Sequence, residues 1–186
     1  MTESRWALLV GAKGAGKSTV AQRIAARLAD RGLRVGGVVQ EAVHEEGERV
    51  AYRARHVGHE DQGGLLLARR GAPPAGAREG ALCDFCSFVF DGDAFAAAAG
   101  WVREDSAACD VVLVDEVSKL EASGGGHHDA IRDALGGRAI VVLVARADQL
   151  FALVERFGLG DALATLDAGE DTSDDAFVEA LVVAAR

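Results

Sequence analysis

The chain has 186 residues, of which 49% are hydrophobic and 26% are charged, and its formal net charge is −9 at pH 7. This length is enough for one α/β domain with a sizeable core and is short for two, so we expect residues 1–186 to form a single domain. The acidic balance argues against nonspecific binding to nucleic acid or to anionic membranes. The three cysteines are an odd number, no secretory leader is evident and no stretch approaches a membrane span, so we expect a cytoplasmic protein.

The first two predicted elements are a strand and a helix. The apolar run Trp6–Val10 predicts a strand. Apolar residues at helical spacing follow from Val20 to Leu28, and Gly32 supplies a stop for that helix. A glycine-rich segment connects the two elements directly.

This connecting segment has the spacing of a phosphate-binding loop, and its residues are Gly11, Ala12, Lys13, Gly14, Ala15, Gly16, Lys17 and Ser18, followed by Thr19. Its glycines permit tight turns, and its backbone N–H groups, with the start of the helix, form a cradle for the α- and β-phosphates. We expect Lys17 to reach the β- and γ-phosphates and the Ser18 hydroxyl to ligate Mg²⁺. The chain holds only three lysines, Lys13, Lys17 and Lys119, so a chance match is improbable. The loop predicts that the chain binds a nucleotide.

The middle of the chain predicts an antiparallel extension. Val35–Gln40 has the pattern of a second strand, and Glu41–Val57 that of a hairpin whose tip is Glu45–Glu48. The elements expected next, in chain order, are a short strand over Gly63–Arg70, a loop over Gly71–Gly80, a strand over Phe85–Phe90 and a helix over Asp91–Glu104, capped near Asp91 or Asp93.

Short apolar runs in the second half predict strands that are buried on both faces, as in a parallel sheet, and these runs are Val111–Val114 and Ala139–Ala145. The remaining expected elements, in chain order, are a turn at Gly124–Gly126, helices over Asp129–Leu135 and Asp148–Phe157, a strand near Leu163–Leu166 and a last helix from Asp174. The whole pattern favours a three-layer α/β fold with a mainly parallel sheet and an antiparallel hairpin extension.

Two acidic residues end the strand at Val111–Val114 in the manner of a Walker B element. A buried strand delivers Asp115 to its carboxyl end, beside the phosphate loop, where Asp115 can hold the Mg²⁺ that Ser18 also ligates. Glu116 follows directly and can orient and deprotonate a water aimed at the γ-phosphate. Switch GTPases carry D-x-x-G here, whereas this chain reads Asp-Glu-Val-Ser from Asp115 to Ser118. The pattern favours a P-loop protein with a catalytic glutamate at a strand end.

Several segments together resemble one family of nucleoside triphosphatases, first described from thermophilic organisms and including a human cancer-related NTPase. The resemblance is carried by the phosphate loop, by GLRVGGVV at Gly32–Val39, by the hairpin and by VLVDEVSKLE at Val112–Glu121. It extends from residue 6 to about 157. It implies a P-loop NTPase fold with a RecA-like sheet and slow, Mg²⁺-dependent hydrolysis of ATP, GTP and other nucleoside triphosphates.

The same resemblance concerns the residues that follow Asp115. It implies that Glu116 is the base, with Lys119 nearby, and both Lys119 and Glu121 keep the places they have in the family's D-E-[IV]-G-x-[ML]-E block. Ser118 stands where that block carries glycine. A glycine there could serve a positive φ, which serine adopts poorly, so the backbone of this turn is a point for the structure to decide.

Other basic residues are weaker candidates for a role in the site. Arg146 ends a predicted strand and could contact the γ-phosphate as a second cation. The stretch from Val144 to Asp148 lies where GTPases carry N-K-x-D and lacks the asparagine, which is weak support for guanine binding. Four arginines of the extension could form a lid, although solvent-exposed arginines are the default interpretation; they are Arg53, Arg55, Arg69 and Arg70.

The cysteines and histidines allow further, less favoured interpretations. Cys83 and Cys86 have metal-ligand spacing but supply two of the four ligands that structural zinc needs, and His56 and His59 could complete the set. His127 and His128 follow three glycines and could lie over the active site, but we expect them to cap a helix or face solvent. Ordinary structural cysteines and histidines are the simpler expectation.

Three functions remain open from the sequence. The first is an NTPase that uses water as acceptor, with ATP or GTP as substrate and Mg²⁺ as cofactor. The second is a nucleotide-binding adaptor that resembles the small GTP-binding proteins of molybdenum-cofactor assembly, in which the 41–57 hairpin contacts a protein partner. The third is a small-molecule kinase, for which Arg69 and Arg70 are a modest indication. Glu116 favours the first, because an adaptor does not need a base at the strand end.

Overall fold

The computed structural model describes residues 5–71, 82–85, 88–170 and 173–186. Its strands are β1 (Trp6–Gly11), β2 (Val35–Glu45), β3 (Glu48–His56), β4 (Gly64–Arg70), β5 (Leu82–Phe85), β6 (Phe88–Asp91), β7 (Val111–Val117), β8 (Ile140–Arg146) and β9 (Thr165–Asp167). Its helices are α1 (Lys17–Asp30), α2 (Gly92–Ala108), α3 (Lys119–Ala122), α4 (His128–Leu135), α5 (Leu150–Phe157) and α6 (Asp175–Ala185), with 3₁₀ turns at Glu60–Gln62 and Ala147–Gln149.

The strands of the described residues join one sheet in the order β5-β6-β4-β3-β2-β7-β8-β1-β9. The five strands from β2 to β9 in this order pair in parallel, and β8 lies between β1 and β7. The apolar runs of β7 and β8 are buried, as expected for strands covered on both faces. Because parallel strands end at one edge, the loop after β1 and the acidic end of β7 lie at the same edge of the sheet.

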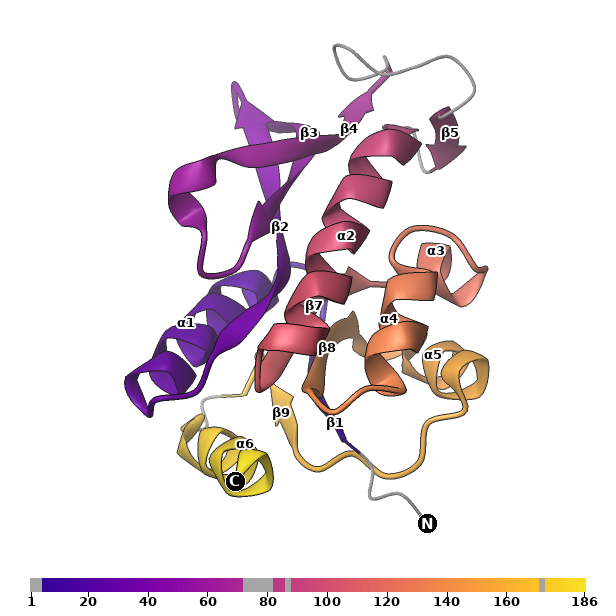
Figure 1. Ribbon diagram of the computed structural model, residues 1–186. Coiled ribbons are helices and arrows are strands. Elements are labelled where there is room, and N and C mark those ends of the chain that lie inside the picture. Colours follow the sequence, from indigo (N-terminus) through magenta and orange to yellow (C-terminus); the bar gives the residue numbers. More distant parts are fainter. Residues whose placement is uncertain (1–4, 72–81, 86–87, 171–172) are drawn as a thin grey trace.

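Strand β2 belongs to both halves of the sheet. Its residues Val35–Val38 pair in parallel with β7, and from Val38 onward it pairs antiparallel with β3. The hairpin turns at Glu46 and Gly47, both with positive φ, and β4, β6 and β5 continue the antiparallel extension. The predicted hairpin is confirmed, and it rises from the parallel sheet as a continuation of β2 (Figure 1).

Helices cover both faces of the sheet and complete three layers (Figure 1). The apolar stripe of α1 and that of α6 pack with Leu9, Leu113 and Val142 on one face. Helices α2, α4 and α5 pack with Val112 and Leu143 on the other face. The predicted three-layer α/β arrangement with a mainly parallel sheet and an antiparallel extension is therefore confirmed.

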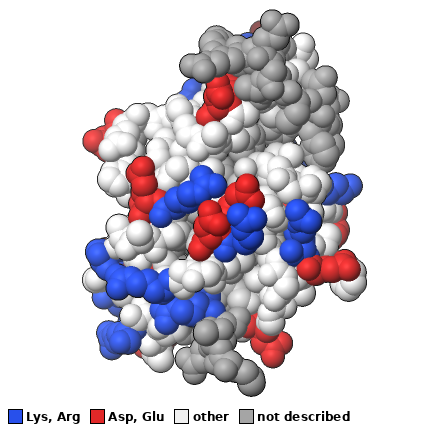
Figure 2. Space-filling model, turned by 45° about the vertical axis from the view of Figure 1, so that its right-hand side comes forward, with Lys and Arg blue, Asp and Glu red and all other residues white. Residues whose placement is uncertain are grey.

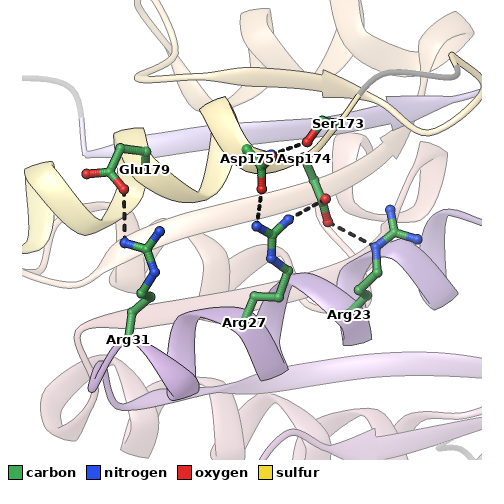
Figure 3. Close-up of polar contacts among 7 residues, drawn as sticks. All are labelled: Arg23, Arg27, Arg31, Ser173, Asp174, Asp175 and Glu179. Carbon is green, nitrogen blue, oxygen red and sulfur yellow. Dashed lines mark hydrogen bonds and ion pairs between the residues drawn. The ribbon is translucent and has the colours of Figure 1, made fainter.

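Ion pairs join α1 to the C-terminal helix (Figure 3). Asp174 accepts from Arg23 Nε at 2.9 Å and from Arg27, which also contacts Asp175. Arg31 pairs with Glu179 at 3.0 Å one turn further along. Burial raises the pKa of Asp174, but the hydrogen bond from Arg23 and the charges of Arg23 and Arg27 outweigh burial and lower that pKa overall. Asp174, Asp175 and Glu179 thus fasten α6 to α1, the helix that follows the phosphate loop.

Three details of the elements differ from the sequence-based expectation. The strand predicted over Phe85–Phe90 is two strands, β5 and β6, paired as a hairpin, with 86–87 outside the described residues. Helix α2 extends four residues beyond Glu104, and its predicted cap is present, since the Asp91 carboxylate accepts from the N–H groups of Asp93 and Ala94. The short helix α3 was not predicted, and residues 72–80 of the predicted loop lie outside the described residues.

The surface mixes charges of both signs. On the face drawn in Figure 2, basic and acidic side chains lie side by side across the middle, and further basic side chains gather below them on the left. None of the helices in the described part of the chain has both the length and the hydropathy that a bilayer span requires.

Candidate active site

The phosphate loop has the conformation that its glycines permit. Gly14 and Gly16 adopt positive φ values of 83° and 77°, in which a side chain would be strained. Lys17 opens α1, is 5% exposed, and its Nζ donates to the carbonyl of Ala12 at 3.1 Å. Neither a side-chain cap nor an acidic residue occupies the first turn of α1, so its N–H groups are available to an anion.

Asp115 is completely buried at the end of β7, and its carboxylate is held by two backbone groups. Oδ2 accepts from the N–H of Gln40 at 3.1 Å and Oδ1 accepts from the N–H of Glu116 at 2.8 Å. The carboxylate also forms a hydrogen bond with the Ser18 side chain. Burial raises the pKa of Asp115 to about 6, which the hydrogen bonds with Ser18, Gln40 and Glu116 partly oppose.

These donors fit a magnesium ion. Mg²⁺ takes oxygen ligands and is commonly held by one carboxylate and one hydroxyl together with phosphate oxygens. Ser18 and Asp115 supply that pair, and they are already within hydrogen-bonding reach of each other. A buried carboxylate whose pKa is raised by burial gains from a neighbouring cation, so the donor set and its surroundings both suit the ion.

Glu116 has an unusual backbone. Its φ is 56°, and the pairing of β7 with β8 is irregular between Val114 and Val117, so Asp115 and Glu116 form a bulge. A glutamate in the left-handed region costs on the order of 1–3 kcal/mol and persists only where the surroundings enforce it. The bulge reorients the end of the strand, and Glu116, half-buried, lines a cavity that Lys17 also lines.

The turn after Glu116 does not need glycine at Ser118. Ser118 has φ of −148°, an extended conformation open to any residue, and the positive φ falls on Glu116 instead. Ser118 is the N-cap residue of α3 in a capping box, in which its N–H donates to Glu121 Oε2 at 2.9 Å and its side chain faces the N–H of Glu121. Lys119, next in the chain, is exposed and lines the cavity.

A buried polar cluster supports this turn, and sequence reasoning missed it. Glu121 is 1% exposed, its Oε1 accepts from the N–H of His127, and burial raises its pKa to about 7. His128 Nδ1 lies 2.9 Å from the Glu121 carbonyl oxygen. His127 is completely buried against Phe95, and burial lowers its pKa to about 4. Of the two expected alternatives, solvent exposure is wrong, because both side chains are buried under α3. The other agrees in position, since His127 is the N-cap residue of α4 and His128 is its first residue, although the His127 side chain forms no capping hydrogen bond.

Arg146 lies at the end of β8, paired in register with Gly11 at the start of the phosphate loop. Its guanidinium forms an ion pair with Asp148 at 2.5 Å, and the residue lines the same cavity as Lys17. Asp148, at the aspartate position of N-K-x-D, is therefore engaged by Arg146.

One cavity of about 840 Å³ brings the predicted site residues together. The four residues proposed from sequence for catalysis all line it, and they are Lys17, Glu116, Lys119 and Arg146. Lys13 and Gly14 of the phosphate loop line it as well. Residues of the antiparallel extension also line it; Arg70 among them was proposed from sequence as part of a lid, whereas Gln40, His44, Arg49, Tyr52 and Phe88 were not foreseen.

The zinc site considered from sequence finds no support among the described residues. His56 is buried, with Nε2 2.9 Å from Asp105 Oδ2 and its ring stacked on Trp101, so its contacts are those of a core residue. Within the described residues no three metal-ligating side chains gather, and Cys86 lies outside them.

The four arginines proposed as a lid do not act together. Arg55 pairs with Glu41 at 2.9 Å and Arg69 with Glu45 at 3.9 Å. Neither of these two arginines lines the cavity, nor does Arg53, whereas Arg70 does.

Comparison with known proteins identifies the family of the chain. The family model described as NTPase matches residues 7–170, which is most of the chain. The chain belongs to this family. The nucleoside-triphosphatase THEP1 of Methanosarcina acetivorans is 27% identical over 162 residues, covering 87% of each protein. That of Methanopyrus kandleri is 31% identical over 137 residues, covering 74% of this chain and 71% of the relative.

Two solved structures share the fold of this nucleoside triphosphatase. The human cancer-related nucleoside triphosphatase superposes with a TM-score of 0.65 at 22% identity, covering 95% of this chain and 93% of the other. THEP1 from the hyperthermophile Aquifex aeolicus superposes with a TM-score of 0.69 at 17% identity, covering 97% and 99%. The predicted P-loop NTPase fold with a RecA-like sheet and the predicted family are both confirmed, and the chain is an NTPase.

Proposed function

We propose that this NTPase hydrolyses ATP, GTP and other nucleoside triphosphates to the diphosphate and phosphate, slowly and with Mg²⁺. The observation that carries the proposal is the junction of Asp115 and Glu116. The buried Asp115 carboxylate meets Ser18 of the phosphate loop, and the bulge that begins there turns Glu116 into the cavity beside Lys17. Residues 1–186 act as a single domain in this account, which the one continuous sheet of the described residues supports.

In this proposal the loop binds the phosphates through backbone amides from Gly11 to Thr19 and through the first turn of α1. Lys17 neutralises the β- and γ-phosphates as a point charge. Ser18 and Asp115 would hold Mg²⁺, which when bound supplies positive charge to the β- and γ-phosphate oxygens.

Glu116 is the proposed base. Its carboxylate accepts a proton from the water that attacks the γ-phosphorus as the bond to the β-phosphate oxygen breaks. Lys17, Lys119 and Arg146 lie around the same cavity and can offset the charge of the transferring group. Arg146 also forms an exposed ion pair with Asp148, and such a surface pair can exchange for a phosphate.

Broad base specificity is part of the proposal. Asp148, the residue at the guanine-reading position, is held by Arg146, and the chain has no asparagine–lysine pair before it. We therefore propose that both ATP and GTP are accepted. A cytoplasmic location, where these nucleotides are abundant and cysteines stay reduced, completes the account.

Phosphate release tests this proposal. The parent should release phosphate from ATP, GTP, CTP and UTP when Mg²⁺ is present and lose activity with EDTA. Lys17→Ala should abolish triphosphate binding in a titration, while the exposed Arg138→Ala should leave both binding and release unchanged. Tight triphosphate binding without release in any condition would favour the adaptor function.

A protein partner at the 41–57 hairpin is a separate proposal. Gln40, His44 and Tyr52, at or near this hairpin, line the nucleotide cavity, so a partner bound to its outer surface would touch an element in contact with the site. A partner-dependent rise in phosphate release, lost when Glu45 and Glu48 at the exposed tip are changed to lysine, would support it.

A further inference from the structure

The wall of the cavity opposite the phosphate loop has its own chemistry. Tyr52 of β3 and Phe88 of β6 pack with ring centroids 4.9 Å apart. An arginine covers each ring, since the guanidinium carbon of Arg49 lies 5.5 Å from the centroid of Tyr52 and that of Arg70 lies 5.5 Å from the centroid of Phe88. We call these four residues the aromatic–arginine wall. All four line the cavity that Lys17 and Glu116 also line.

The arginines of this wall retain capacity for an anion. Arg49 donates from Nη1 to the Tyr52 hydroxyl at 2.9 Å, and in the described part of the chain it has no carboxylate partner. Its Nε is buried and lacks a hydrogen-bond acceptor among those residues. Arg70 pairs at 2.8 Å with Glu48, whose side chain is 73% exposed, and such a surface pair exchanges readily for a better ligand. Two guanidinium forks are thus available to a phosphate or carboxylate.

The wall and the phosphate loop line the same cavity, and the proposed chemistry decides which side of the γ-phosphate the wall faces. If Glu116 activates the attacking water, as proposed above, the attacking side of the γ-phosphorus faces Glu116, and the leaving diphosphate with its nucleoside lies on the opposite side. The wall lines the same cavity as Glu116 and as Lys119, which follows Glu116 in the same turn. A ligand on the wall therefore lies on the attacking side, next to the γ-phosphate.

We propose that the aromatic–arginine wall is a second ligand site, for a small molecule that combines a planar ring with an anionic group. Aromatic rings and arginine planes bind a planar ring by stacking, and the guanidinium forks bind its phosphate. The cavity of about 840 Å³ is large enough for such a molecule beside the terminal phosphates. Nucleoside monophosphates belong to this class. A ligand in this place would exclude the attacking water and so regulate turnover, an inference that rests on the proposed function.

Calorimetric titration of AMP, GMP, CMP and UMP tests the site directly. The protein is first saturated with Mg²⁺ and a β,γ-imido triphosphate, so that the phosphate loop is filled. We expect at least one monophosphate to bind. Arg49→Ala and Arg70→Ala should each weaken its affinity about 10-fold or more. Arg49→Lys should bind it little better than Arg49→Ala does, because lysine lacks the planar fork of arginine. Arg69→Ala is the matched control, since Arg69 neighbours Arg70 and does not line the cavity.

The kinetics give an independent readout. A monophosphate on the wall should lower the maximal rate of phosphate release from ATP without raising the KM for ATP. The proposal is overturned if none of the four monophosphates binds the loaded protein, if the Arg49 and Arg70 variants bind like the parent, or if inhibition only raises the KM. Failure of the proposed hydrolysis would appear separately, as absent phosphate release in the parent, because the titration uses a triphosphate that is not hydrolysed.

Discussion

The carboxylate of Asp115 accepts a hydrogen bond of 3.1 Å from the backbone N–H of Gln40. This bond joins the end of β7 to β2 two residues after Val38, where β2 leaves the parallel sheet for the antiparallel extension. The Gln40 side chain reaches back to the Asp115 carbonyl at 3.5 Å. The proposed magnesium ligand is therefore held by β2, which pairs with β3, the strand that carries Arg49 and Tyr52 of the aromatic–arginine wall.

Binding of Mg²⁺ and triphosphate should weaken in acid. Burial raises the pKa of Asp115 to about 6, and a carboxylate must be deprotonated to hold the ion. The affinity for Mg²⁺ and triphosphate should therefore be highest above pH 7 and should fall by up to about tenfold per pH unit below pH 6. Titrations of the imido analogue with Mg²⁺ between pH 5 and 8 would measure this. Asp115→Asn should bind weakly at every pH, and a parent affinity that stays constant down to pH 5 would contradict the assignment.

Glu116→Gly should separate stability from activity. Glycine adopts a φ of 56° without strain, so the variant should gain up to about 1 kcal/mol in the free energy of unfolding while losing phosphate release. Glu46, at the hairpin tip with a φ of 51°, offers the matched control. Glu46→Gly should show a similar gain in urea denaturation with normal activity. A Glu116→Gly protein that is clearly less stable than the parent would show that the surroundings favour the glutamate itself.

His127 should make stability depend on pH. Burial lowers its pKa to about 4 from 6.5 in the unfolded chain, so the unfolded state binds the extra proton between these values. The stability that it contributes is present above pH 6.5 and is lost as pH falls toward 4. Relative to the parent, His127→Leu should therefore be more favourable at pH 5 than at pH 8. Urea midpoints at both pH values test this, and Phe151→Ala, at an exposed residue without a titratable group, should shift both midpoints equally.

Asp174 should matter for the attachment of α6. Its side chain is 10% exposed and contacts two arginines of α1, so Asp174→Asn should cost about 1–2 kcal/mol (Figure 3). The pKa of Asp174 is lowered, so this contribution is present above the unfolded value of 3.8 and disappears as pH falls below it. Asp175→Asn, at a side chain 73% exposed, should lose less in thermal unfolding. Equal losses of stability in the two variants would mean that burial of Asp174 does not strengthen its contacts with the arginines of α1.

Local sequence patterns predicted the part of the site that depends on neighbouring residues. The spacing of Gly11, Gly16 and Lys17 determines the phosphate loop, and the apolar run before Asp115 places that carboxylate at a strand end. Both follow from short-range rules of glycine conformation and strand burial. The cap of α2 at Asp91 was predicted for the same reason.

Features that depend on tertiary contacts were missed. The positive φ of Glu116 arises from a bulge against β8, which no local pattern encodes. Burial of His127 depends on α2, since Phe95 covers it. Helix α3 is an exception, because Ser118 and Glu121 form the S-x-x-E pattern of a capping box, a local signal that was available.

Arg70 was proposed from sequence as part of a lid, but the assembled aromatic–arginine wall could not be predicted from sequence. Arg49, Tyr52, Arg70 and Phe88 come from three strands, and their meeting depends on the register of β3, β4 and β6. The two-residue period of a strand shows which of its own residues share a face, but it does not show which residues of different strands meet.

The central claim is that Glu116 activates the attacking water, and phosphate release by Glu116→Gln at saturating ATP and Mg²⁺ tests it most directly. Glutamine keeps the size of the side chain and removes its basicity. The account predicts a rate roughly 10²-fold or more below that of the parent, with unchanged affinity for the imido analogue. Release at the parent rate would contradict the account, and the base would have to be another group.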